Sequence, residues 1–242
     1  AVRELRRRGA YKSAPEPALL DLLDLVALAT VADVVPLVGL NRAFVTRGLA
    51  VMSRRQNTGL QALFDAASLD QAPTPYTLGF VLGPRINAGG RIGDAGLGAR
   101  LLSTSDPAEA ARIAALLEKL NRERKAIETG MLGEAVAEAD RLIEAEPELA
   151  IIVVGSEAWH KGVVGLVASR ITDRFRRPAC VISWMADGGG AKDQGTGSLR
   201  SVAGVDVGSA VRAAVAAGHL VKGGGHAMAA GLTVEEFVSA TT

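Results

Sequence analysis

Several short motifs combine arginine, histidine or serine with glycine, residue types that proteins use to bind phosphate groups. Residues 83–91 read Gly-Pro-Arg-Ile-Asn-Ala-Gly-Gly-Arg, which places Arg85, Asn87 and Arg91 close together in the chain. A guanidinium is a planar fork that suits phosphate oxygens, and glycine lets the backbone approach a ligand closely. We expect 83–93 to be a flexible loop that either guides a phosphate backbone or carries ordinary solvated arginines.

A second motif, Trp159 to Gly165, is expected where a strand leads into a helix. The N-terminus of a helix presents free N–H groups that attract an anion, and Gly162 and Gly165 would bring that N-terminus close to the sheet. Trp159 could stack or cap there, and His160 could bond to phosphate. A lone histidine more often has a structural role, so that alternative stays open.

A third motif runs from Gly197 to Ser201. A strand there would place Ser198 and Arg200 on one face and Ser201 on the other, because side chains alternate along a strand. An arginine beside a serine on one face could clamp a phosphate group, although this motif alone is a weak signal.

The fourth motif, 223–231, opens with three glycines followed by His226. Backbone N–H groups are unshielded at glycine, so Gly224 and Gly225 could form a nest for a phosphate beside His226. The alternative is a flexible turn followed by a strand of small residues.

Residues 29–37 read Ala-Thr-Val-Ala-Asp-Val-Val-Pro-Leu, with a single acid, Asp33, at the end of an apolar helix. A buried carboxylate is costly unless it is paired or bound to a cation. Asp33 is therefore expected to be either a hydrogen-bond acceptor at a helix end or a ligand of a metal ion.

The elements that must hold these motifs change type along the chain. The first 82 residues carry apolar residues at helical spacing, and Pro36 prevents the first main helix from continuing beyond Asp33. We predict helices at residues 17–32, 40–55, 59–67 and 75–82.

One long helix is predicted next. Asp106, Pro107 and Glu109 form a typical helix start, with an acid at the N-cap and proline in the first turn. Pro147 ends the apolar pattern. A helix of about 40 residues would be about 60 Å long, which is typical of a connector between two lobes.

Beyond that helix the pattern becomes α/β. The predicted strands are 150–154, 178–184, 196–201 and 227–233, with helices at 162–175 and 207–217 and a polar turn at 185–194. The predicted fold class is therefore α/β, with an all-helical lobe (1–105), a connecting helix (106–146) and a small mixed α/β domain (147–242). We expect the two lobes to fold independently, with a boundary inside the 106–146 helix, near residue 146.

Composition excludes several classes of protein. Hydrophobic residues make up 48% of the 242 residues, and 27 Lys+Arg against 26 Asp+Glu leave the net charge uninformative about partners. A single cysteine, Cys180, excludes an internal disulfide framework and fits a reducing compartment such as the cytoplasm. The sequence contains no run of about 18 uncharged apolar residues, so no membrane span is predicted. Because the chain starts without Met inside an expected helix, we expect it to be a fragment.

Taken in order, the five motifs resemble those of the RecJ family of DHH phosphoesterases, over about residues 15–232. Gly89 stands where that family more usually has alanine, and Lys161 where it usually has glutamate. The resemblance implies a 5′→3′ exonuclease that degrades single-stranded DNA in repair and recombination. It also implies two lobes with a cleft between them, spanned by the long helix, of which residues 1–105 would be the end of the DHH lobe.

The resemblance implies roles for particular residues. Asp33 matches one catalytic ligand of a Mn²⁺ or Mg²⁺ pair, whose other ligands, including the Asp-His-His triplet, are absent from this chain. Ser198 and Arg200 match residues that hold the 5′-terminal phosphate, and His226 matches a catalytic residue that contacts the substrate phosphate. The other expected substrate-binding residues are Arg85, Asn87, Arg91, Trp159, His160, Gly224 and Gly225. Without the missing ligands and the family's trailing OB-type domain, the fragment is expected to be inactive alone.

Two other functions stay open at this point. A DHH phosphoesterase for oligoribonucleotides or cyclic dinucleotides would share the glycine-histidine motif, but we do not expect it to carry 83–91. A non-catalytic nucleic-acid-binding module is an alternative of a different class. The expected partner is single-stranded DNA, with a single-strand-binding protein and a helicase as further candidates and no membrane.

Overall fold

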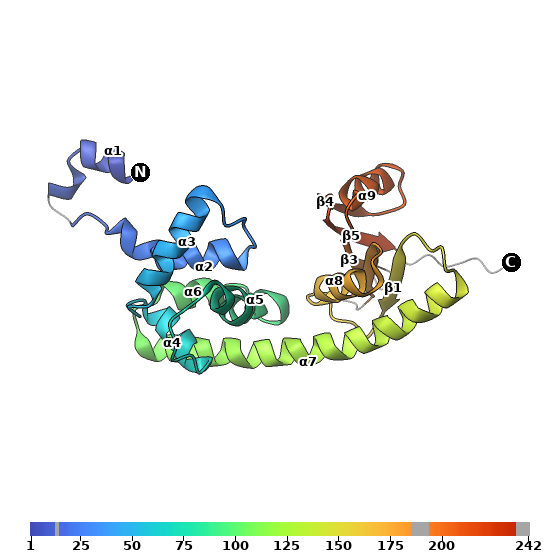
Figure 1. Ribbon diagram of the computed structural model, residues 1–242, viewed down its shortest axis with the longest axis horizontal. Coiled ribbons are helices and arrows are strands. Elements are labelled where there is room, and N and C mark those ends of the chain that lie inside the picture. Colours follow the sequence, from blue (N-terminus) through green and yellow to red (C-terminus); the bar gives the residue numbers. More distant parts are fainter. Residues whose placement is uncertain (13–14, 185–193, 236–242) are drawn as a thin grey trace. The chain divides into compact units, whose positions relative to one another are not determined.

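The computed structural model describes residues 1–12, 15–184 and 194–235. By its internal contacts the chain divides into a first unit, Ala1–Asn121, and a second unit, Arg122–Thr242. The division lies inside the long helix α7 (Pro107–Ala145), within the predicted connector 106–146 but before residue 146 (Figure 1). That the two lobes fold independently stays a prediction. None of the described helices is long and apolar enough to cross a membrane.

The first unit is built from helices throughout its described residues. Before α7 these are α1 (Val2–Arg7), η1 (Ala10–Lys12), η2 (Leu19–Leu22), α2 (Leu23–Ala32), α3 (Gly39–Met52), α4 (Thr58–Ala66), η3 (Thr77–Leu82), α5 (Gly83–Ile92) and α6 (Leu97–Ser103). The four helices predicted between residues 17 and 82 are present. The first begins later than predicted, because residues 19–22 form a short 3₁₀ turn with Leu19 and Leu20 exposed.

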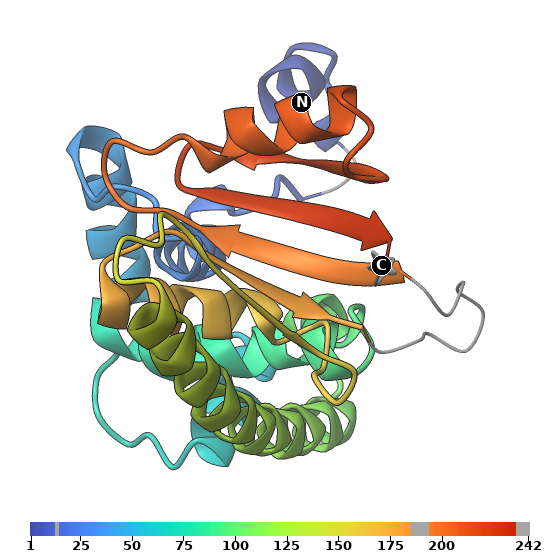
Figure 2. The same cartoon turned by 90° about the vertical axis from the view of Figure 1, so that its right-hand side faces the viewer.

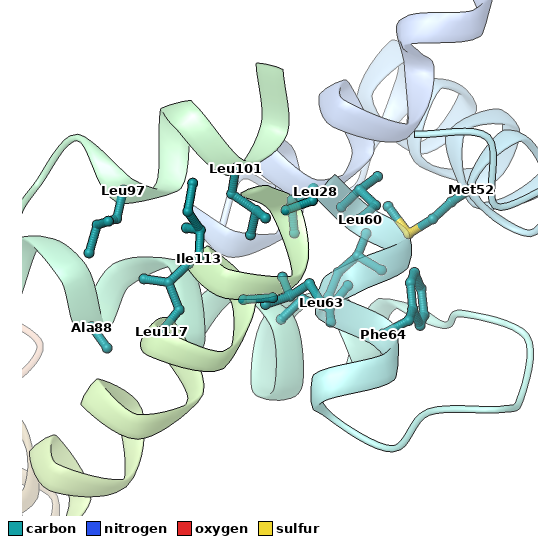
Figure 3. Packing of buried hydrophobic residues seen from close by; sticks show 14 of the residues in the cluster. Leu28, Met52, Leu60, Leu63, Phe64, Ala88, Leu97, Leu101, Ile113 and Leu117 are labelled. Atoms are coloured by element: carbon teal, nitrogen blue, oxygen red, sulfur yellow. The ribbon is translucent and has the colours of Figure 1, made fainter. Parts of the chain in front are cut away.

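One hydrophobic core holds this unit together (Figure 3). Leu28 of α2, Leu63 of α4 and Leu101 of α6 meet Ile113 and Leu117 of α7, and all five side chains are buried. A fully buried leucine or isoleucine contributes roughly 1.5–3 kcal/mol. The core therefore joins the start of α7 firmly to the helices that carry Asp33 and residues 83–91.

The prediction of a loop at 83–93 is wrong, since Gly83–Ile92 is the helix α5. Pro84 lies in the first turn, where a helix tolerates proline because that N–H has no helical partner. A Cβ atom on Gly89 would lie 2.9 Å from the Asp94 carbonyl oxygen and 3.3 Å from Leu117. Glycine here serves close packing and not flexibility. The short helix α6 was not predicted.

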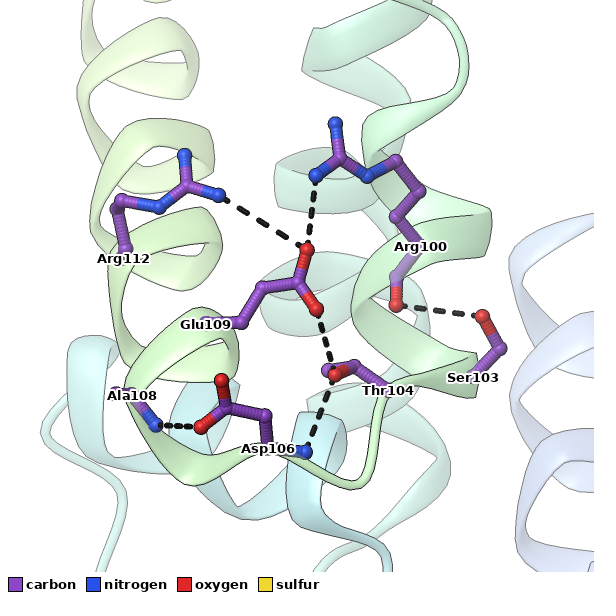
Figure 4. A network of polar contacts seen from close by, with 7 residues as sticks. All are labelled: Arg100, Ser103, Thr104, Asp106, Ala108, Glu109 and Arg112. Atoms are coloured by element: carbon purple, nitrogen blue, oxygen red, sulfur yellow. Dashed lines mark hydrogen bonds and ion pairs between the residues drawn. The ribbon is translucent and has the colours of Figure 1, made fainter.

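The predicted start of α7 is confirmed, with Asp106 Oδ1 accepting a hydrogen bond from the Ala108 N–H at 2.9 Å. Glu109 does not bond back to Asp106 as a capping box would. It instead accepts hydrogen bonds from Arg100 at 2.8 Å and Thr104 at 2.7 Å, which ties α6 to α7 (Figure 4). The bond from Arg100, followed by that from Thr104, lowers the pKa of Glu109.

The second unit is a mixed sheet with helices, as the predicted fold class requires. After α7 come β1 (Ile152–Ser156), α8 (Val164–Phe175), β2 (Ala179–Ser183), β3 (Gln194–Arg200), α9 (Val207–Ala216), β4 (Lys222–His226) and β5 (Ala229–Glu235). The strand order is β1-β2-β3-β5-β4, with β1 parallel to β2 and the other neighbours antiparallel. The turn predicted at 185–194 lies outside the described residues except for Gln194.

The sheet lies between α8 and α9 (Figure 1). Val207 and Val211 of α9 share a core with Cys180, Leu199 and Ala230 on one face, and burial raises the pKa of the Cys180 thiol to about 12. Ser198 and Arg200 alternate with Leu199, so they point to the opposite face, where α8 packs. Figure 2 shows β3 in orange beside β5 in red, with the short β4 beyond.

The glycine segment 223–225 is a strand, so the predicted nest or turn is wrong. Residues 222–226 form β4, which pairs with β5 in a hairpin. A Cβ atom on Gly223 would lie 2.6 Å from Val211 Cγ1, and one on Gly225 would lie 2.3 Å from the Ala229 carbonyl oxygen. The glycines therefore let α9 and β5 approach β4 closely, in an extended edge strand and not in the compact turn of an anion nest. That Gly224 and Gly225 contact a phosphate stays a prediction.

Candidate functional site

Strand register brings two of the predicted motifs onto one face of the sheet. Ser198 of β3 pairs with Gly231 of β5, which pairs with Gly224 of β4; one step along, Arg200 pairs with Ala229, which pairs with His226. Paired residues point to the same face. We call the surface formed by these six residues, Ser198, Arg200, Ala229, Gly231, Gly224 and His226, the open face.

The open face has a floor of small residues between two charged or titratable ones. Arg200 and His226 stand in one row, two strand spacings apart, which is about 10 Å between their Cα atoms. Gly231 and His226 are exposed, and Ala229 between Arg200 and His226 has only a methyl group. Only small side chains therefore separate Arg200 from His226 along this row.

Arg200 is oriented by its own strand. Its Nη1–H donates to Ser198 Oγ at 2.9 Å and to the Leu199 carbonyl oxygen at 2.8 Å. Burial lowers the pKa of the guanidinium, although arginine keeps its proton in proteins. Across the described residues no carboxylate pairs with it. Arg200 thus presents a fixed, half-buried positive charge.

The N-terminus of α8 lies against this pair of side chains. A Cβ atom on Gly165 would lie 3.0 Å from Arg200 Nη2 and 3.1 Å from Ser198 Oγ. Any larger residue here would push these side chains by a few tenths of an ångström. The close approach brings the motif 159–165 to the motif 197–201. The first turn of α8 adds N–H groups with no helical partner, which favour an anion.

His160, in the loop before α8, is half-buried, and one of its two ring nitrogens is already hydrogen-bonded. Its Nδ1 accepts a hydrogen bond from the Gly162 N–H at 3.0 Å. A neutral His160 must then carry its proton on Nε2, which makes that atom a donor. The geometry allows the predicted bond to a phosphate without showing one.

Trp159 does not offer its ring for stacking. It is 2% exposed, and its Nε1–H donates to Glu134 Oε2 of α7 at 2.6 Å. Its carbonyl oxygen accepts a hydrogen bond from the buried Ser183 hydroxyl at 2.5 Å. Trp159 therefore fixes the loop before α8 to α7 and β2, which corrects the prediction that it contacts substrate.

The sequence motifs missed a third row on the same side of the sheet. Thr196 of β3 pairs with Thr233 of β5, and Thr233 pairs with Lys222 of β4, one step beyond the row of Ser198. This row lies about 7 Å from the Ser198 row, at two residues of about 3.4 Å each. Lys222 would have been found from the sequence only by recognising β4 as a strand.

Asp33 lies at the rim of a cavity in the first unit. The cavity has a volume of about 540 Å³, and its lining includes Asp33, Thr30, Gly83 and Asn87. Asp33 is the C-cap residue of α2, and its carboxylate is exposed. α5 therefore brings three residues of 83–91, Gly83, Ile86 and Asn87, to the same cavity as the acid that was predicted to bind metal.

The two arginines of α5 are less available than predicted. Arg85 Nε donates to Glu118 Oε2 of α7 at 2.6 Å and Nη1 to the Val81 carbonyl oxygen at 2.8 Å, and its side chain is only 13% exposed. A partly buried ion pair of this kind holds α5 on α7. Arg91 is half-buried and also has a polar partner.

Asp33 can give one ligand to a metal ion, but the described residues do not complete a metal site. Within them, no group of three or more His, Cys, Asp or Glu side chains is placed to hold a cation. A carboxylate oxygen at a cavity rim is a ligand that Mg²⁺ and Mn²⁺ accept. Any metal centre at Asp33 needs further ligands from elsewhere.

Comparison with known proteins gives a consistent result. Residues 147–240 match the DHHA1 domain. The single-stranded-DNA-specific exonuclease RecJ of Escherichia coli is 42% identical over 225 residues, 91% of this chain and 38% of that protein. RecJ of Dickeya dadantii is 41% identical over 232 residues, 94% of this chain and 39% of that protein. The chain therefore spans about two fifths of the length of these relatives.

A solved structure is similar as well. The crystal structure of RecJ in complex with Mn²⁺ from Thermus thermophilus superposes with a TM-score of 0.79 at 35% sequence identity. The match covers 93% of this chain and 32% of that one. The order of helices and strands described above is thus shared with a RecJ structure over nearly all of this chain.

Proposed function

We infer that this chain, a homologue of RecJ over most of its length with a DHHA1 domain at residues 147–240, is the substrate-binding domain and part of the catalytic lobe of an exonuclease. The proposed substrate is single-stranded DNA, degraded from its 5′ end by hydrolysis of phosphodiester bonds. The proposed role is in DNA repair and recombination.

One observation carries this proposal: three motifs that are far apart in the sequence meet at the open face. Gly165 of α8 lies against Ser198 and Arg200 of β3, and His226 stands in the same row as Arg200. A hydroxyl, a guanidinium, an imidazole and a helix N-terminus together suit a phosphate group. Contacts to phosphate are independent of base sequence, as a nuclease that accepts any strand needs.

In the proposed complex, Arg200 and Ser198 hold the 5′-terminal phosphate. A terminal phosphate carries more negative charge than an internal diester, so a fixed guanidinium favours a strand end over a strand interior. Partial burial of Arg200 strengthens this preference, because charges interact more strongly at lower effective dielectric. Lys222 and Thr233 would then contact the next phosphate along the strand.

Mn²⁺ or Mg²⁺ is the proposed cofactor, with Asp33 as one ligand and the remaining ligands outside the described residues. A bound pair of such ions activates a water molecule and stabilises the charge that develops on the scissile phosphate. Asn87 lines the same cavity as Asp33 and is proposed to orient the strand there. We assign Arg85 to holding α5 on α7, because its guanidinium is already paired with Glu118.

Nuclease assays on the full-length protein that contains this chain test the proposal. With Mn²⁺ present, a duplex with a 5′ single-stranded tail should be degraded and one with only a 3′ tail should not. Faster cleavage of short oligoribonucleotides or cyclic dinucleotides would favour the small-substrate phosphoesterase instead. Binding of single-stranded DNA without cleavage under all metal conditions would favour a non-catalytic module.

A further inference from the structure

The end of α2 that carries Asp33 has a defined cap. The Val34 N–H donates to the Val31 carbonyl oxygen at 3.1 Å, and the Val35 N–H donates to the Thr30 carbonyl oxygen at 3.0 Å. This pair of bonds is the Schellman pattern, in which the residue after the C-cap adopts the left-handed conformation and is usually glycine. Here that residue is Val34, with φ at 56°.

Valine is a poor choice for this position if stability alone matters. In the left-handed conformation Cβ crowds the following carbonyl oxygen, and a β-branched residue is a clear outlier there. Burial of the side chain does not compensate within the described residues, because Val34 is 87% exposed. A cap that served only the fold would be better built with glycine.

Two side chains of α3 hold the backbone just after the strained residue. Asn41 Nδ2 donates to the Pro36 carbonyl oxygen at 3.2 Å, and Arg42 Nε donates to the Leu37 carbonyl oxygen at 3.0 Å. With the two cap bonds on the other side, the conformation at Val34 is fixed from both directions. Such strain persists only where the surroundings over-determine it, and it concentrates at functional sites.

We propose that Val34 is a positioning residue for Asp33, and this rests on the metal-binding role proposed for Asp33. The branched side chain restricts the backbone, and the clamp from Asn41 and Arg42 sets the direction in which the Asp33 carboxylate points at the cavity. Glycine at position 34 would relieve the strain but widen the range of positions open to the helix end. A displacement of about 1 Å in a catalytic group can lower a rate by about 100-fold.

The first unit contains a matched cap away from this cavity. α4 ends with Ser68 in the left-handed conformation at φ 54°. The Ser68 N–H donates to the Asp65 carbonyl oxygen and the Leu69 N–H to the Phe64 carbonyl oxygen, both at 3.0 Å. Ser68 does not line the cavity of Asp33. Ser68→Gly therefore relaxes the same backbone geometry without touching the proposed site.

The test compares Val34→Gly, Ser68→Gly and Asp33→Ala in the full-length protein. The measurements are the thermal midpoint, the Mn²⁺ dissociation constant by calorimetry, and kcat and KM on 5′-phosphorylated single-stranded DNA. Both glycine variants should keep the parental midpoint or exceed it by about 2 °C. Val34→Gly should weaken Mn²⁺ binding and lower kcat, each about tenfold, with KM little changed. Ser68→Gly should match the parent in Mn²⁺ affinity, kcat and KM.

Several outcomes would overturn the proposal. Parental Mn²⁺ affinity and kcat in Val34→Gly would mean that the strain has no bearing on Asp33. A lowered midpoint in Val34→Gly, or equal losses in both glycine variants, would assign Val34 to the fold alone. The Asp33→Ala variant separates this proposal from the one it rests on: if that variant keeps Mn²⁺ affinity and activity, the metal-binding role of Asp33 is wrong.

Discussion

The open face of the second unit and the Asp33 cap of the first unit hold their polar groups in different ways. On the open face, a regular hydrogen-bond ladder sets the positions of Ser198, Arg200 and His226. At the cap, Asp33 follows the last turn of a helix and precedes a strained residue, Val34. A ladder tolerates the loss of one side chain, whereas an irregular cap depends on a few particular bonds. Substitutions at the two places should therefore fail in different ways.

Replacing Asp33 should have the largest effect on activity. In the full-length protein, Asp33→Ala should lower kcat by more than about 100-fold, because even residues that only support metal ligands typically contribute 10- to 100-fold. The thermal midpoint should stay within a few degrees of the parent, since the carboxylate is exposed. Near-normal Mn²⁺-dependent activity would mean that Asp33 is merely a residue at a helix end.

Trp159 should show the opposite behaviour, with a large effect on stability. Trp159→Ala should lower the free energy of unfolding by about 3–5 kcal/mol, because a buried ring is lost. Denaturant unfolding of the full-length protein measures this. A base-stacking role would instead weaken DNA binding while leaving the unfolding free energy unchanged, and that result would restore Trp159 to the substrate site.

Gly165 tests the contact between α8 and the open face. Gly165→Ala should favour the helix slightly but push the Arg200 guanidinium by a few tenths of an ångström, since the new Cβ would lie 3.0 Å from Nη2. We expect a DNA affinity about three- to tenfold lower with an unchanged or higher thermal midpoint. Gly133→Ala in α7, where a Cβ meets nothing within 4 Å, is the matched control. Equal affinities for both variants would contradict the close approach.

Lys222 should give the smallest effect. Lys222→Ala should lower affinity for single-stranded DNA by less than about fivefold, because an exposed ion pair contributes roughly 0.2–1 kcal/mol. The loss should be the same for all sequences and should reduce the salt dependence of binding by about one phosphate contact. Lys125→Ala on α7 is the control, and an identical salt dependence in Lys222→Ala and Lys125→Ala would mean that Lys222 makes no phosphate contact.

Much of the fold could be predicted because its signals are local. The start of α7 follows from Asp106 and Pro107, and the strands β1 and β2 follow from runs of β-branched residues. The pairing of Ser198 with Arg200 on one face needed only the alternation of side chains along a strand.

Other features depend on contacts between distant residues and could not be predicted. The strand β4 was not predicted, because its three glycines have no side chains that could show an alternating pattern. Only their packing against α9 explains why glycine stands there. The helix α5 was not predicted, because its glycines are typical of a loop. The packing of Gly89 against Leu117 explains them in a helix. Trp159 was assigned to substrate because its partner, Glu134, lies 25 residues away in the sequence.

The most direct test of the account is the preference for a strand end. In the full-length protein, Arg200→Ala should lower the ratio of initial rates on 5′-phosphorylated and 5′-hydroxyl single strands by about 10- to 100-fold, the value of one charge-assisted hydrogen bond of roughly 1.5–3 kcal/mol. Arg174→Ala, at an exposed arginine of α8 near Asp140, should leave the ratio unchanged. If Arg200→Ala slows both substrates equally, Arg200 contacts the general backbone, and the open face does not recognise the 5′ end.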